Sequence, residues 1–92
     1  MVHTTQHAQV RMQQRGITRV TLESLLDYGA VAHDHRGAEI VYFDKKAKSR
    51  ILKASGRQQF RALEKQLNAY AVVAGDGAVV TVGRREKRIR RA

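Results

Sequence analysis

The sequence predicts an α+β fold in which two N-terminal helices and one inserted helix pack on a small, largely antiparallel four-stranded sheet, in the order ααββαββ. Two observations support this fold class. Residues 5–28 hold two segments with helical spacing of apolar side chains. Residues 70–82 hold two short apolar runs around Gly75-Asp76-Gly77, which is typical of a β-hairpin. Because 92 residues can bury one modest core, we expect a single domain over 1–92.

The first helix is predicted over residues 5–15. The segment is rich in Gln, Arg, Met and Ala and contains no Gly or Pro. Thr4 or Thr5 can accept a hydrogen bond from the free amides of the first turn. Gly16 is expected to end the helix.

The second helix is predicted from Thr18 to Tyr28, and its local signals are the strongest in the chain. Thr18 can cap the first turn, Ile17 and Leu22 can form a hydrophobic staple, and Gly29 suits the left-handed position after a helix. The apolar residues recur at helical spacing and should face the core: Val20, Leu22, Leu25 and Leu26.

The middle of the chain is predicted to change from helix to strand at Gly37, after a polar loop that starts at Gly29. Ile40 to Phe43 is a β-branched and aromatic run that predicts a strand, and Arg50 to Lys53 predicts a weaker strand paired with it. Helical spacing returns from Gly56 to Asn68, with one apolar face that should pack on the core: Phe60, Leu63 and Leu67.

The last two strands are predicted over residues 70–74 and 78–82. Both runs are almost continuously apolar, which indicates central strands covered on both faces. Thr81 lies among valines in the second run.

The composition indicates an anionic partner. The formal net charge is +10 and the pI is about 10.9, beyond what solubility requires. Residues 1–46 carry six Lys and Arg against five Asp and Glu, and residues 47–92 carry twelve against three. The densest run is an expected basic C-terminal tail over 84–92. We expect that partner to be RNA, ahead of DNA.

Other classes of protein are disfavoured. The chain has no Cys, so neither disulfides nor thiolate metal sites can stabilise it, as is common in a reducing cytoplasm. We expect a cytoplasmic protein without a membrane segment, because no apolar run approaches the length of a bilayer span. We also predict no metal and no cofactor. His33-Asp34-His35 could place two imidazoles on one side of a strand, but a polar loop explains it better.

A polar stripe on the first predicted helix is the candidate catalytic site. His7 and Arg11 are four residues apart, and Gln14 and Arg15 continue the stripe. Apolar residues bracket it, so we expect the stripe to border a cleft or the sheet: Val10 on one side, Ala8 and Met12 on the other.

RNA cleavage can use this combination. The attacking 2′-hydroxyl needs a base, which His7 could supply, and the added negative charge at phosphorus needs cations such as Arg11 and Arg15. Thr81 could point into the same cleft, although β-propensity alone explains a Thr there. Spacing alone favours the alternative in which His7 bonds within the fold and the arginines are ordinary surface cations.

Nucleic-acid contacts are predicted on the inserted helix and on the tail. Closely spaced cations repel one another and gain most by neutralising phosphates, although a solvated tail or an acidic protein partner would explain them too. Tyr42 and Tyr70 could stack bases or lie in the core. The predicted binding residues are Arg57, Arg61, Lys65, Arg84, Arg85, Lys87, Arg88, Arg90 and Arg91.

The residues His7-x-x-x-Arg11-x-x-x-Arg15-Gly16-Ile17-Thr18, then Leu22, Leu25, Gly29 and Tyr42, then Val79-Val80-Thr81-Val82 resemble a known arrangement. They look like a bacterial family of small domains of unknown function that opens with His-x-x-x-Arg-x-x-x-Arg-Gly-Ile. That family is similar in layout to the BrnT-type and RelE-type ribonuclease toxins, basic α+β domains often encoded with a neutralising antitoxin. The resemblance implies roles for His7, Arg11, Arg15 and Thr81, and an acidic antitoxin as partner.

Three functional hypotheses remain open from the sequence. The first is a metal-independent endoribonuclease of toxin-antitoxin type, in which Arg84 helps to hold the phosphate. The second is a non-catalytic RNA- or DNA-binding module, in which His7 is structural. The third is a basic protein that docks an acidic partner protein. Cleavage of RNA that depends on His7 separates the first from the other two.

Overall fold

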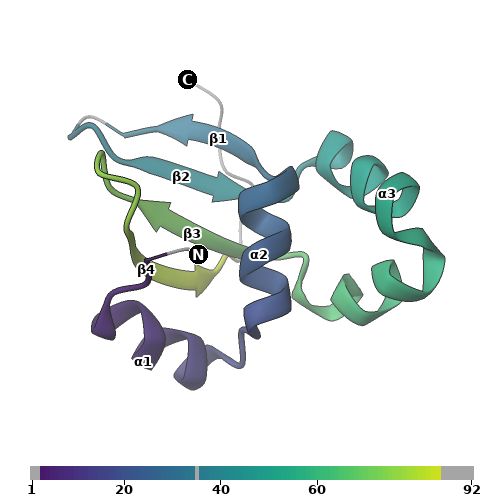
Figure 1. Ribbon diagram of the computed structural model, residues 1–92, viewed down its shortest axis with the longest axis horizontal. Helices are drawn as coiled ribbons and strands as arrows, with labels where there is room; N and C mark the ends of the chain where they lie inside the picture. The colour runs from purple at the N-terminus through teal and green to yellow at the C-terminus, as the bar shows by residue number, and fades with distance from the viewer. Residues whose placement is uncertain (1–2, 35, 86–92) are drawn as a thin grey trace.

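The computed structural model describes residues 3–34 and 36–85 and confirms the α+β fold in the predicted order (Figure 1). The four strands form one antiparallel sheet in the order β1-β2-β3-β4. Helix α2 crosses one face of the sheet, α1 lies along β4, and α3 stands beyond α2 (Figure 1). The elements are α1 (Gln6–Arg15), α2 (Arg19–Tyr28), β1 (Ala30–His33), β2 (Glu39–Tyr42), α3 (Lys45–Leu63), the 3₁₀ helix η1 (Glu64–Gln66), β3 (Ala69–Val73) and β4 (Val79–Arg84).

The predicted boundaries of α1 are confirmed. The side chain of Thr5 accepts a hydrogen bond from the Ala8 amide at 3.2 Å. Gly16 adopts a left-handed conformation with φ of 64°, and its N–H bonds back into the last turn. Ala8 is fully buried, so this helix is anchored by a side chain small enough to bring it close to the sheet.

The predictions for α2 are confirmed at its start and wrong at two other points. Thr18 caps the helix by accepting from Thr21 N at 3.2 Å. Gly29 is not left-handed, since its φ is −66°. It is required for space, because a Cβ there would lie 2.4 Å from the Leu25 carbonyl oxygen and 2.6 Å from Val41 Cγ1. Val20, expected in the core, is 46% exposed.

Two predictions for the middle of the chain are wrong. Residues expected to form a loop after Gly29 form β1, which pairs with β2. The strand expected from Arg50 to Lys53 is instead part of α3. Asp44 caps that helix by accepting from Ala47 N at 2.7 Å, and the residues that follow are mostly good helix formers.

Helix α3 is longer than predicted and bends at Gly56, where φ is 80° and ψ is 171°. A glycine tolerates this backbone conformation, which other residues rarely adopt. The predicted end at Asn68 is wrong, because α3 stops at Leu63 and η1 follows. The predicted core contacts are confirmed, since Leu63 is buried and Phe60 and Leu67 pack against the core.

The predicted hairpin of β3 and β4 is confirmed, but only β3 is central, because β4 lies at the edge of the sheet. One face of β3 and β4 belongs to the core. The opposite face carries Tyr70 and Val72 of β3 and Thr81 of β4, because Thr81 pairs with Val72 and alternates with Val82. A register shift after Val72 pairs Val73 with Val79, which returns Val79 to the core face. The core side chains of the two strands are Ala69, Ala71, Val73, Val79 and Val82.

Candidate functional site

Helix α1 is held along the edge strand β4 at both of its ends. At its start, Thr5 N donates to Val79 O at 3.0 Å and Thr5 Oγ1 donates to Val80 O at 3.2 Å. At its end, Arg84 Nε donates to Arg15 O at 2.8 Å. The helix and the strand therefore run side by side in the same direction.

This parallel arrangement places Thr81 at a level between His7 and Arg11. Ten helical residues span about 15 Å, and the six residues of a strand such as β4 span a similar distance. Thr81 is the third residue of β4, and His7 and Arg11 are the second and sixth residues of α1. His7, Arg11 and Thr81, which are far apart in the sequence, thus lie along one edge of the fold.

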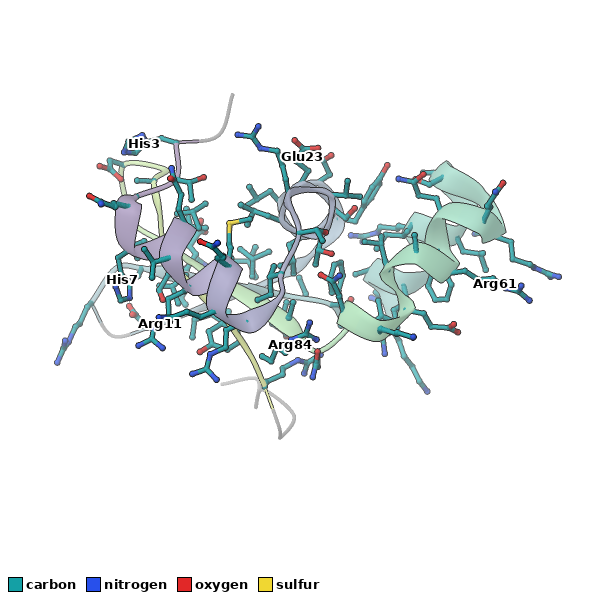
Figure 2. The ribbon with its side chains drawn as sticks, turned by 90° about the horizontal axis from the view of Figure 1, so that it is seen from below. His3, His7, Arg11, Glu23, Arg61 and Arg84 are labelled. Atoms are coloured by element: carbon teal, nitrogen blue, oxygen red, sulfur yellow. The ribbon has the colours of Figure 1, made fainter. Side chains whose placement is uncertain are left out.

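The three side chains border the same side of the molecule. His7 and Arg11 point away from Glu23 of α2 (Figure 2). Thr81 lies on the sheet face opposite the core, because its neighbour Val82 is in the core. We call His7, Arg11 and Thr81 the α1–β4 edge. His7 is exposed, whereas Arg11 and Thr81 are half-buried.

The stripe on α1 borders the sheet along one side only. Ala8 is buried and Met12 packs against the core, which confirms the expected contact on that side. Val10, which brackets the stripe on its other side, is 46% exposed. The stripe therefore lies between the sheet and solvent, where a large ligand can reach it.

Arg84 has a different environment from the one predicted for a phosphate-binding residue. Besides Arg15 O, its guanidinium donates to Gly16 O at 3.4 Å. Its Nη1 donates to Lys65 O at 3.1 Å and to Asn68 Oδ1 at 3.0 Å. All three of its nitrogens are used inside the fold, so Arg84 joins the end of α1 to η1. Arg15 contributes its carbonyl to this junction, and its side chain is exposed.

Arg85 also makes contacts within the fold. Its Nη2 donates to Phe43 O at 2.6 Å, and its guanidinium carbon lies 5.3 Å from the centre of the Tyr42 ring. Tyr42 is only 4% exposed, so its ring is not free to stack a base in this conformation. Tyr70 is half-buried on the same sheet face.

The other predicted binding residues lie in two places. Arg57 and Arg61 are exposed on α3, and Lys65 is exposed on η1. Helix α3 stands on the far side of α2 from α1 (Figure 1), whereas the main chain of Lys65 lies near the end of α1 through Arg84. The remaining tail residues lie outside the described residues: Lys87, Arg88, Arg90 and Arg91.

Sequence reasoning missed the basic residues in the first half of α3. Lys46, Arg50 and Lys53 are exposed there. The signal that could have found them is the cap Asp44 followed by helix formers, with Ala47 and Ile51 four residues apart and both fully buried. The β-branched Ile51 instead favoured a short strand at Arg50 to Lys53.

Two other places could bind a ligand or a metal ion. Between α1 and α2 lies an open groove of about 400 Å³, lined by both polar and apolar side chains that include Gln9, Met12 and Arg19. Over residues 3–34 and 36–85, no three His, Cys, Asp or Glu side chains come together as a metal site. His33 instead lies across from Glu39, with Nδ1 4.0 Å from the carboxylate, and His35 is outside the described residues.

The fold and the site define a small basic α+β domain with an accessible helix–strand edge. The chain belongs to a family described as a domain of unknown function, DUF4258, whose model matches residues 4–84. No curated protein and no solved structure matches the chain. In the part of the chain that the structure describes, no helix is both long enough and apolar enough to span a lipid bilayer.

Proposed function

We propose that the protein binds RNA and cleaves it without a metal ion at the α1–β4 edge. The observation that carries the proposal is the pairing of α1 with β4, which brings His7, Arg11 and Thr81 to one accessible edge. An imidazole, a guanidinium and a hydroxyl are groups that phosphoryl transfer in RNA can use.

In the proposed reaction the RNA supplies its own nucleophile. His7 takes the proton from a ribose 2′-hydroxyl, and the oxygen attacks the adjacent phosphorus. The new bond to the 2′ oxygen forms as the bond to the 5′ oxygen breaks, and the leaving oxygen takes a proton from water. The products are a 2′,3′-cyclic phosphate and a 5′-hydroxyl end, so no metal or redox partner is needed.

Arg11 and Thr81 would stabilise the charge that develops at phosphorus. Arg11 is one helical turn from His7, and its guanidinium can donate two hydrogen bonds to phosphate oxygens. It is half-buried against the sheet, which restricts its motion more than that of a fully exposed arginine. The Thr81 hydroxyl can donate one further hydrogen bond from the strand side.

The resemblance to ribonuclease toxins supports this proposal and extends it. It favours a cytoplasmic bacterial protein that is neutralised by an acidic antitoxin. The net charge of +10 suits such a partner. A short acidic reading frame beside the gene would support this part of the proposal.

A second function is favoured by the environment of His7. Within the described residues its imidazole makes no hydrogen bond, so no protein group fixes which ring nitrogen faces a substrate. A non-catalytic RNA-binding module would have the same cationic surface without needing that orientation.

The test is incubation of the purified protein, free of any partner, with end-labelled RNA in the presence of a chelator. Fragments that end in a cyclic phosphate would support the ribonuclease. Retarded but intact RNA would select the binding module. Intact RNA without any retardation, with and without ribosomes, would contradict both functions.

A further inference from the structure

The first half of α3 carries a basic surface that is separate from the α1–β4 edge. Lys46, Arg50 and Lys53 follow one another at spacings of four and three residues, so they line one side of the helix. The stripe extends about 10 Å along the axis. Ala47 and Ile51 are fully buried and anchor the helix beside it. We call Lys46, Arg50 and Lys53 the α3 stripe.

Among the residues that the structure describes, no carboxylate neutralises the α3 stripe. Helix α3 contains seven Lys and Arg and no Asp or Glu. Over residues 3–34 and 36–85, none of the three stripe residues forms an ion pair. Like charges three and four residues apart on a helix repel each other. An external polyanion would remove that repulsion.

The charges also oppose the dipole of their own helix. Lys45 and Lys46 lie in the first turn of α3, whose positive end disfavours cations, and Asp44 is the only carboxylate at that end. Helix stability therefore does not account for the placement of these lysines. A bound polyanion would offset this unfavourable placement.

We propose that the α3 stripe is a second RNA-binding site, which holds the phosphate backbone of the RNA without reading its sequence. This inference rests on the proposed function, since it assumes that the ligand is RNA. A linear row of cations matches a linear polyanion, and the stripe lacks the aromatic side chains that would contact bases. Arg61, on the second half of α3 beyond the bend, is a further exposed cation of this helix (Figure 2).

The position of the stripe gives the site a specific role. Helix α2 lies between α1 and α3 (Figure 1), so we expect an RNA of a few nucleotides at the α1–β4 edge not to reach the stripe. A longer RNA can contact both surfaces. The stripe should therefore raise the affinity for long RNA and leave the chemistry at the edge unchanged, as expected for linked binding sites.

The experiment compares two double variants with equal total charge. R50Q/K53Q removes two stripe cations, and R19Q/R36Q removes two exposed cations from α2 and the β1–β2 turn. Binding to fluorescent single-stranded RNAs of 6 and 30 nucleotides is measured by anisotropy at several salt concentrations, with DNA of the same sequence and polyglutamate as competitors. Circular dichroism checks that both variants fold.

For R50Q/K53Q we expect about tenfold weaker binding of the long RNA and a salt slope smaller by about 1.4, as for two lost phosphate contacts. Binding of the short RNA should not change. Equal losses in both variants, or no loss in R50Q/K53Q, would overturn the proposal. So would stripe-dependent binding of polyglutamate but not RNA, or of DNA alone.

The outcomes also separate this inference from the proposed function. Stripe-dependent binding of long RNA without any cleavage would support the stripe and contradict the ribonuclease. Cleavage of long RNA with equal KM in wild type and R50Q/K53Q would support the ribonuclease and contradict the stripe. Restored affinity in R50K/K53R would show that charge, and not the particular side chain, is what the RNA needs.

Discussion

Arg84 donates a hydrogen bond from Nε to the main-chain carbonyl of Arg15 at 2.8 Å, although the two residues are 69 positions apart in the sequence. The same guanidinium reaches Lys65 O and Asn68 Oδ1. A single side chain at the end of the edge strand thus holds the end of α1 and the end of η1 together.

The first prediction concerns this junction. Arg84→Ala should lower the free energy of unfolding by about 2 kcal/mol, because the last carbonyls of α1 lose a charged donor that remains partly solvated. Arg84→Lys should recover little, since an ammonium cannot reproduce the planar fork of the guanidinium. Urea denaturation measures both. Weaker RNA binding by Arg84→Ala with unchanged stability would instead identify Arg84 as a phosphate ligand.

The fold was predictable wherever local signals were strong. The capping residue Thr18 predicted the start of α2, and Gly75 to Gly77 predicted the turn between the two strands of the hairpin. Between Gly29 and Gly56 the strand predicted at Ile40 to Phe43 is confirmed as β2, but strand propensity is weak in the region that forms β1. The Lys-rich segment of α3 depends on Asp44 and on buried contacts that only the fold supplies.

The site was predictable only in part. Helical spacing alone grouped His7 with Arg11, but their position beside Thr81 depends on hydrogen bonds between residues more than 60 positions apart. For the same reason, no sequence pattern could show that the Arg84 guanidinium donates hydrogen bonds to main-chain carbonyls. A long-range contact of this kind leaves no local periodicity.

The second prediction concerns close packing at Gly29. Gly29→Ala should destabilise the protein by about 1 to 3 kcal/mol, because the new methyl would overlap the Leu25 carbonyl and Val41. Gly75→Ala is the matched control, since a Cβ there meets nothing within 4 Å. Thermal denaturation should give a clearly lower melting temperature for Gly29→Ala than for Gly75→Ala. Equal stability would mean that the α2–β2 contact relaxes without cost.

The third prediction concerns the buried hydroxyl of Thr21. It donates to Gln66 Oε1 at 2.6 Å and thereby ties α2 to η1. Thr21→Val should cost about 1 to 2 kcal/mol, because the hydroxyl is fully buried and Gln66 Oε1 would keep only its longer hydrogen bond from Thr18 N, at 3.3 Å. Urea denaturation of Thr21→Val, Gln66→Met and the double variant measures the coupling. Fully additive losses would show that the two side chains do not interact.

The most direct test of the central claim compares RNA cleavage by His7→Ala and His3→Ala in chelator. His3 and His7 are both exposed and point to opposite sides of the N-terminal segment (Figure 2). If the α1–β4 edge is the site of cleavage, His7→Ala should lose activity on the order of a hundredfold, and His3→Ala should match the wild type. Equal cleavage rates in all three proteins would contradict a role for His7 and move the chemistry away from this edge.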